Sequence, residues 1–146
     1  MFLGQFYHNL DEKGRLTVPA RFRDLLAAQG GYVIRGFDRN LMVILSSSFE
    51  KMHQDINQMS MTDPTVRSLR RLWFSGADQV EVDKAGRILI SQNLRQWATI
   101  EDSVVIVGNG DYFEIWSPEA WAAQATQLQD AEANAQKFAA LTITSG

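Results

Sequence analysis

Residues 10–18 read LDEKGRLTV and residues 82–90 read VDKAGRILI, so one pattern recurs at a shift of 72 residues. In both copies an aspartate, a glycine and an arginine coincide, and apolar residues then follow at alternate positions. This alternation predicts a half-buried strand after a tight turn. Glycine supplies the positive φ of such a turn, and aspartate accepts backbone N–H groups at its start. The residues predicted to fix the two turns are Asp11, Gly14, Asp83 and Gly86.

The similarity extends beyond the turns, because the same shift aligns Arg23 with Arg95 and Gly36 with Gly108. Self-similarity of this length indicates a duplicated unit. A lone pair of hairpins buries too little surface to be stable, so the copies are expected to complete one core. We therefore predict one structural domain with two halves. Residues 1–75 form the first half, with a helical insertion, and residues 76–146 form the second, with a long C-terminal helix.

Each copy predicts a strand, a turn, a second strand, a short helix and another hairpin, which makes an α+β fold. Pro19 suits the first position of one short helix, and Ser91 suits the N-cap of the other. Ser117 and Pro118 predict the start of one long alanine-rich helix. The predicted strands are 5–10, 16–18, 32–34, 41–45, 79–82, 88–90, 104–107 and 112–116, and helices are predicted over about 48–58 and from Pro64 to Phe74.

The composition excludes several classes of site. The 146 residues include no cysteine, which rules out a disulfide framework, thiolate-bound zinc and a thiol nucleophile. The N-terminus has no basic leader and the longest aliphatic runs are strand-sized, so we expect a soluble, cytoplasmic protein without a membrane partner.

The charge is distributed unevenly along the chain. The net charge is −3, yet residues 1–75 carry ten Lys or Arg against seven Asp or Glu. Residues 76–146 carry four Lys or Arg against ten Asp or Glu. A basic face on an acidic protein is therefore compatible with the sequence, and a cluster of cations runs from Lys13 to Arg23.

The motifs resemble two known groups of proteins. The Asp-x-x-Gly-Arg turn, its apolar strand and the Leu-Arg that follows are similar to bacterial transition-state regulators of the AbrB/SpoVT type. FLG at 2–4, DEKGRLTVPARFR at 11–23, FSGA at 74–77 and DKAGRI at 83–88 together resemble the MraZ family over nearly the whole chain. The resemblance implies a swapped-hairpin, AbrB-like barrel with flanking helices.

The resemblance also implies a function. It points to a nucleoid-associated transcriptional regulator of the division and cell-wall gene cluster, which binds short direct repeats of double-stranded DNA upstream of that cluster as a ring-shaped homo-oligomer. The implied contacts with DNA are Arg15 and Arg87, with Arg23 and Arg95 added by similarity to the wider regulators. Lys13 and Arg21 lie in the same cationic cluster and complete the predicted DNA-binding set. Asp24 and Gln96 depart from the simpler regulators, which carry a second arginine there.

Two interpretations of the motif arginines stay open from spacing alone. Each arginine either contacts DNA, where a guanidinium can bind guanine O6 and N7, or pairs with the aspartate of its own turn and only staples the hairpin. Arg67, Arg70 and Arg71 share a helical face that is either solvated or in contact with an acidic neighbouring subunit. A protein-interaction scaffold and an antitoxin-like DNA binder are the alternative functions.

Catalysis is not indicated. The chain has no P-loop and no nucleophile elbow, and Gly108-x-Gly110 lacks the third glycine of a dinucleotide loop. His8 and His53 have no partner at a metal-ligand or triad spacing. We expect no enzymatic activity, no cofactor, no metal and no small-molecule substrate.

Overall fold

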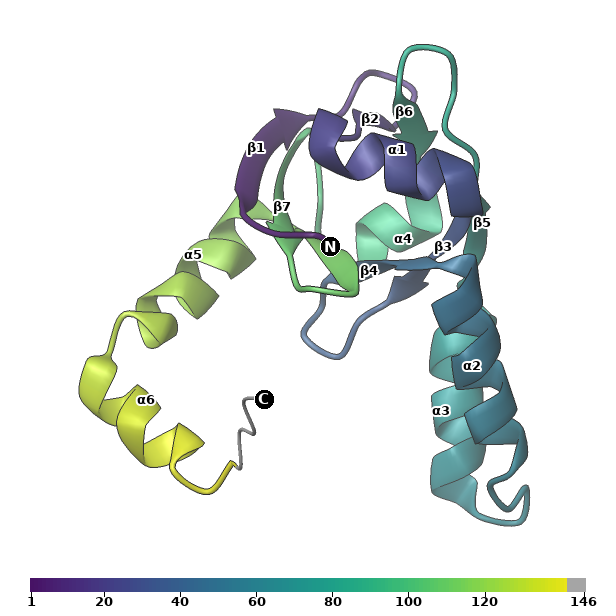
Figure 1. Cartoon of the computed structure of the whole chain (residues 1–146), viewed down its shortest axis with the longest axis vertical. Coiled ribbons are helices and arrows are strands. Elements are labelled where there is room, and N and C mark those ends of the chain that lie inside the picture. The colour runs from purple at the N-terminus through teal and green to yellow at the C-terminus, as the bar shows by residue number, and fades with distance from the viewer. Residues whose placement is uncertain (142–146) are drawn as a thin grey trace.

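A computed structural model describes residues 1–141, so the last five residues of the second predicted half lie outside the described part (Figure 1). Each half contains the predicted succession of two strands, a short helix and a hairpin. In chain order they are β1 (Gln5–Asn9), β2 (Arg15–Thr17), α1 (Ala20–Gln29), β3 (Gly31–Arg35), β4 (Leu41–Leu45), α2 (Ser46–Asn57), α3 (Pro64–Phe74), β5 (Asp78–Val80), β6 (Arg87–Leu89), α4 (Gln92–Trp97), β7 (Ser103–Gly108), β8 (Tyr112–Trp116), α5 (Pro118–Leu128) and α6 (Ala131–Phe138).

The main sheet contains strands of both halves in a symmetric order. Its six strands follow the order β1-β7-β8-β4-β3-β5, and all neighbours are antiparallel. The repeat relates β1 to β5, β3 to β7 and β4 to β8, so reading the order backwards gives the same arrangement. Strand β1 of the first half pairs with β7 of the second, and β5 of the second half pairs with β3 of the first. Neither half therefore forms a complete sheet by itself.

A second, two-stranded sheet of β2 and β6 joins the halves at the symmetry axis. Leu16 lies opposite Ile88, its own counterpart in the repeat, and both side chains are almost fully buried. Arg15 lies opposite Leu89, and Thr17 lies opposite Arg87. The pseudo-twofold axis thus passes between Leu16 and Ile88.

Aromatic side chains from both halves meet in one core. The ring of Phe22, on α1, packs edge-on against Phe2 and Phe6, with centroid distances of 5.0 Å and 5.3 Å. The ring centroid of Phe113, on β8, lies 5.2 Å from the ring centroids of both Phe2 and Phe22. Burying each such ring stabilises the folded state by about 1.5–3 kcal/mol. Because the cluster draws on both halves, neither half can bury it alone.

Helix α4 lies in the body, and the helices α2, α3, α5 and α6 form two arms on opposite sides of it, pointing away from β2 and β6 (Figure 1). One arm is α2 and α3, which pack on β3 and β4 through the stacked rings of Tyr32 and Phe49. Arg35 secures this arm by donating to the carbonyl oxygens of Leu72 and Arg71, each at 2.9 Å. The other arm is α5 and α6. Trp121 anchors α5 against β7 and β8, whereas α6 buries no residue.

The α+β class is confirmed. Within residues 1–141 the six-stranded sheet is open at β5, which covers three residues and pairs only with β3, so the expected barrel is not confirmed. Two finer expectations are corrected. The long C-terminal helix is wrong: it breaks into α5 and α6 at Asp130, whose side chain caps α6 by accepting from the Ala133 N–H at 3.0 Å. Pro19 precedes the first helical residue of α1 and does not occupy it. Among the described helices, none has both the length and the apolar character needed to cross a membrane.

The close packing under the second turn yields a stability prediction. Gly86 has φ +79°, and an added Cβ would overlap the guanidinium of Arg23. Gly110 has φ +84° but has open space around it, which makes it a matched control. We expect Gly110→Ala to cost about 1–2 kcal/mol of backbone strain. Gly86→Ala adds about 1–3 kcal/mol of overpacking to that strain. Urea denaturation measures both, and equal losses would contradict the predicted packing.

Candidate functional site

The two Asp-x-x-Gly-Arg turns lie together at the end of the body opposite the arms (Figure 1). Asp11 Oδ1 accepts from the backbone N–H of Lys13 at 3.0 Å and of Arg15 at 2.8 Å. Asp83 Oδ1 makes the equivalent bonds to Ala85 at 2.9 Å and to Arg87 at 2.8 Å. The repeat therefore builds the same turn twice, side by side.

The second oxygen of each aspartate holds the arginine of its own turn. Arg15 Nε donates to Asp11 Oδ2 at 2.6 Å, and Arg87 Nε donates to Asp83 Oδ2 at 3.0 Å. Asp11 also lies 3.6 Å from a terminal nitrogen of Arg87, so it links the two turns. Within the described residues, the terminal nitrogens of Arg15 have no protein acceptor. The hydrogen bond to Asp11 thus uses only the Nε of the Arg15 guanidinium and leaves its two terminal nitrogens for another acceptor.

The same hydrogen bonds shift the ionisation of both aspartates. The backbone N–H of Arg15, helped by its side chain, holds the pKa of Asp11 below its ordinary value of 3.8. The backbone N–H of Arg87 does the same for the pKa of Asp83. Both carboxylates are therefore charged at neutral pH and can keep the arginines oriented.

The outer face of the β2–β6 ribbon is formed by four side chains, because directly opposite residues of an antiparallel pair point to the same face. The arginine side chains are about one third exposed, at 33% for Arg15 and 31% for Arg87. Leu89 is 60% exposed. Lys13 and Lys84 are exposed at the turn tips. The four members of the ribbon face are Arg15, Thr17, Arg87 and Leu89.

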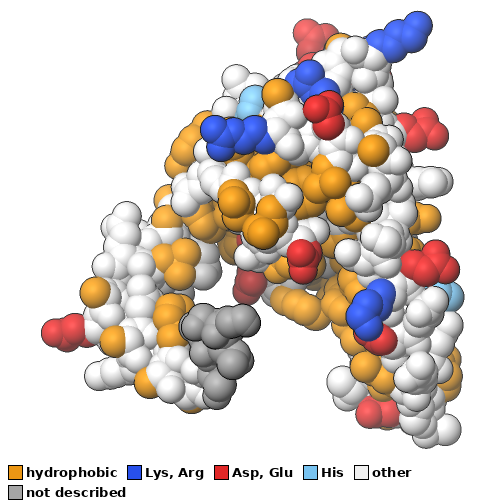
Figure 2. All heavy atoms as spheres, in the orientation of Figure 1, with side chains coloured by type: hydrophobic (Ala, Val, Ile, Leu, Met, Phe, Trp, Pro, Cys, Tyr) orange, Lys and Arg blue, Asp and Glu red, His pale blue; other side chains and the backbone are white. Residues whose placement is uncertain are grey.

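The charge of this end differs from that of the whole chain. Lys13, Lys84 and the two motif arginines face three acidic side chains, Asp11, Glu12 and Asp83. Basic and acidic side chains are interspersed at this end (Figure 2). The two turns are locally cationic in a chain of net charge −3. Such a local surplus can hold an anionic partner only at short range.

Arg23 and Arg95 have a different environment from Arg15 and Arg87. Each is half-buried beneath the turn of the other half: Arg95 lies under Gly14, and Arg23 under Gly86. Arg23 also donates to the carbonyl oxygen of Val18 at 3.0 Å. Their Nε atoms are buried and have no acceptor within residues 1–141. Both arginines therefore support the turns from inside, and their contact with DNA stays a prediction.

Arg21, which was predicted to belong to the DNA-binding set, is exposed on α1. Lys84, Thr17 and Leu89 were not predicted from the sequence, and they lie on or beside the ribbon face. The repeat alignment carried the signal for the last two, because Thr17 and Leu89 are counterparts at the shift of 72 residues. No cluster of three or more potential metal ligands occurs in the described part of the chain.

The depressed aspartate pKa values predict the pH dependence of stability. Unfolding returns the pKa of both carboxyls to its ordinary value, so their contribution is fully present above about pH 4 and is lost as pH falls through the lower folded values. The double variant Asp11→Asn/Asp83→Asn should lose less stability than the wild type between about pH 4 and 2. Urea denaturation at a series of pH values measures this. Asp24→Asn, at an exposed position of α1, should keep the wild-type profile; a wild-type profile in the double variant would refute the assignment.

Comparison with known proteins gives one consistent family. The model of the family described as "MraZ protein", which that description relates to antitoxin-like proteins, matches residues 1–72 and again residues 73–143. A protein of Thermomicrobium roseum named "Transcriptional regulator MraZ" is 44% identical over 142 residues, covering 97% of this chain and 99% of that protein. A protein of the same name from Roseiflexus castenholzii is 44% identical over 95% of this chain and 94% of its own length. Another from Herpetosiphon aurantiacus is 46% identical over 83% of this chain and 84% of its own length. The two matches of one family model and these identities show that the chain belongs to the MraZ family.

Proposed function

We propose that this protein is a DNA-binding transcriptional regulator that uses the ribbon face of β2 and β6 to bind short direct repeats upstream of the division and cell-wall gene cluster. The observation that carries the proposal is the geometry of Arg15. Its Nε is held by Asp11, and its terminal nitrogens lack an acceptor within residues 1–141. The names of the relatives, transcriptional regulators, support the same function.

A two-stranded antiparallel ribbon has the dimensions to enter the major groove of B-form DNA. A guanidinium oriented by a carboxylate loses little conformational freedom when it binds, which favours specific contact over loose attraction. Arg15 and Arg87 are related by the pseudo-twofold axis, so one ribbon presents two such groups. We propose both as base contacts, with Lys13 and Arg21 on neighbouring phosphates.

The proposal includes assembly into a ring. An eight-residue helix without buried residues is unstable alone, and α6 is such a helix. Its Phe138 is 45% exposed, and Leu128, at the end of α5, is 46% exposed. A partner surface that covers these side chains would stabilise the arm.

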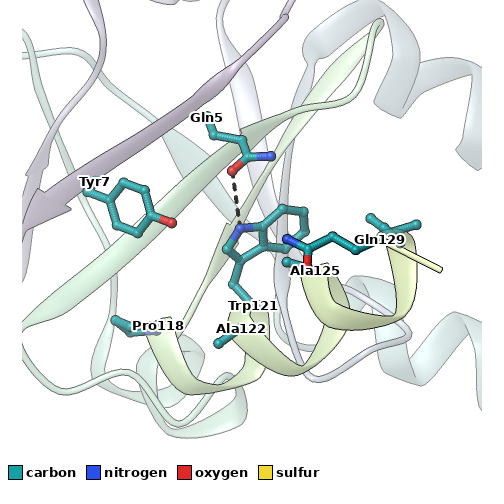
Figure 3. A pocket seen from close by; sticks show the side chains of 8 residues that line it. Gln5, Tyr7, Pro118, Trp121, Ala122, Ala125 and Gln129 are labelled. Carbon is teal, nitrogen blue, oxygen red and sulfur yellow. Dashed lines mark hydrogen bonds between the residues drawn. The ribbon is translucent and has the colours of Figure 1, made fainter. Parts of the chain in front are cut away.

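A groove beside the same arm could bind part of a neighbouring subunit. It has a volume of about 430 Å³ and lies between the exposed ring of Tyr7 on β1 and the helix α5 (Figure 3). Trp121 lines this groove, and its Nε1–H donates a hydrogen bond to Gln5 Oε1 at 3.3 Å. The two arms lie on opposite sides of the body, so contact between unlike arms of successive subunits is head-to-tail, and a head-to-tail contact that closes makes a ring. The swapped-hairpin barrel is also part of this proposal, and the pairings of β1 with β7 and of β5 with β3, which exchange strands between the halves, support it.

The arms also make a protein-interaction scaffold the second candidate, and an antitoxin-like DNA binder the third. One experiment separates the scaffold from the regulator. Purified protein should retard DNA from upstream of its own operon in a gel shift, whereas a pure scaffold would leave that DNA unretarded.

The first functional prediction concerns Arg15. Arg15→Ala should abolish specific retention of that DNA, because each lost base contact costs about 1–3 kcal/mol and the loss is multiplied across subunits. Fluorescence anisotropy with labelled upstream DNA measures the affinity. Circular dichroism and light scattering check that the fold and the oligomer survive.

Lys51→Ala is the matched control, because Lys51 is an exposed cation on α2 that pairs with Asp55 at 3.7 Å, far from the ribbon. It should bind DNA like the wild type. Normal DNA binding by a folded Arg15→Ala protein would leave Arg15 with the stapling role alone.

The second functional prediction concerns avidity. Linking subunits turns later contacts into intramolecular ones and raises affinity about 10²–10⁴-fold when the sites match the spacing of the array. Leu128→Asp/Phe138→Asp places charges on the exposed apolar side chains of the arm, so it should reduce the oligomer mass in light scattering. Its affinity for an array of repeats should fall to the level of a single repeat.

Ala123→Asp, at an exposed α5 position that does not line the groove, is the control and should retain the oligomer. In the wild type, inserting half a helical turn between repeats about 10 bp apart should collapse binding. A single repeat bound as tightly as the array would contradict the multivalent mechanism.

A further inference from the structure

The two halves of the ribbon face differ at one pair of equivalent positions. Thr17 and Leu89 are counterparts in the repeat, and each lies opposite the arginine of the other half. Leu89 is 60% exposed, while its neighbours Ile88 and Ile90 are almost fully buried. The sequence therefore places a polar side chain on one half of the ribbon face and a large apolar one on the other.

The exposure of Leu89 is not relieved by the arms, since both point away from β2 and β6 (Figure 1). Its cross-strand partner is Arg15, and directly opposite side chains in an antiparallel pair lie about 4.5–5.5 Å apart at Cβ. A leucine thus stands next to the arginine that is clamped by Asp11. Any surface that binds Arg15 along the ribbon also meets Leu89.

The chemistry of the major groove supplies one apolar feature that fits such a side chain. Guanine offers O6 and N7 to an arginine, and thymine offers its 5-methyl group to an apolar residue. Successive bases of one strand are about 3.4 Å apart, and two flexible side chains whose Cβ atoms are about 4.5–5.5 Å apart can converge to that spacing. A guanidinium and a neighbouring leucine can therefore contact adjacent base pairs.

We propose that Leu89 is a specificity-determining residue, which contacts the methyl group of a thymine adjacent to the guanine bound by Arg15. Thr17 replaces it beside Arg87 with a shorter side chain that carries a hydroxyl group, so the two halves of the ribbon present different chemistry to the bases. One chain then has a defined direction on DNA despite its pseudo-twofold body. This inference rests on the proposed function, since it requires that the ribbon face binds DNA.

The test removes only the methyl group. In the upstream DNA of the protein's own operon, each thymine of the repeats is replaced in turn by deoxyuridine, and affinity is measured by fluorescence anisotropy. One replacement should weaken wild-type binding about fourfold per contact, as expected for one methyl group taken from water. Leu89→Ser, whose side chain has no methyl group, should bind the thymine and deoxyuridine versions equally.

Two further variants complete the design. Leu3→Ser removes another exposed leucine, 57% exposed at the N-terminus, and should keep the wild-type discrimination. Thr17→Leu should increase sensitivity to a second thymine, next to the guanine bound by Arg87. Light scattering on all three variants checks that the oligomer is intact.

The outcomes distinguish this inference from the function on which it rests. Wild-type protein that binds the array but treats every deoxyuridine like thymine would overturn the role of Leu89 and leave DNA binding standing. Leu89→Ser protein with a smaller oligomer and unchanged discrimination would make Leu89 a subunit contact and overturn the inference as well. Absence of any DNA binding by the wild type would overturn both.

Discussion

Leu16 and Ile88 face each other at the centre of the β2–β6 pair, and the backbone around them ties each half to the turn of the other. The Val18 N–H donates to the Gly86 carbonyl oxygen, and the Ile90 N–H donates to that of Gly14, both at 2.9 Å. Separating the two strands would expose the aliphatic side chains of Leu16 and Ile88 and break both backbone hydrogen bonds. The core and the ribbon face are therefore one cooperative structure, and damage to either turn is transmitted to both halves.

This arrangement divides the arginines of the repeat by role. Arg15 and Arg87 stand outside the ribbon and are oriented by carboxylates, whereas Arg23 and Arg95 lie inside and support the turn glycines of the opposite half. The inner pair fixes the position of the turns, and the turns fix the outer pair. Preorganisation of this kind suits specific recognition, because little freedom is lost when the outer groups bind.

The pseudo-symmetry of the body is not matched by its surface. Asp11 contacts both motif arginines, while Asp83 contacts only its own within the described residues. The arms also differ, since α2 and α3 are secured by Arg35 and α6 buries nothing. A symmetric framework with unlike sides can make directional contacts, both with a neighbouring subunit and with an asymmetric ligand.

Much of the fold was predictable, because alternation of apolar residues and turn glycines are local signals. The repeat located both turns, both hairpins and the clamping aspartates, since an aspartate and a glycine act on their own backbone neighbours. It failed at Asp130, where a capping side chain competed successfully with alanine-rich helix propensity. It did not predict that the sheet is open at β5, because the pairing of an edge strand depends on backbone far away in the sequence.

The sequence by itself determined that two equivalent turns exist and that each carries an arginine four residues after an aspartate. Only the tertiary structure decided which arginines face outwards. Arg15 and Arg23 are the same residue type, but Arg15 lies on the exposed face of its own turn and Arg23 lies beneath the turn of the other half. The tertiary structure also decided that Leu89 stands exposed beside Arg15. That neighbourhood arises from strand register between segments about 72 residues apart, and register is set by the packing of Leu16 on Ile88 in the shared core.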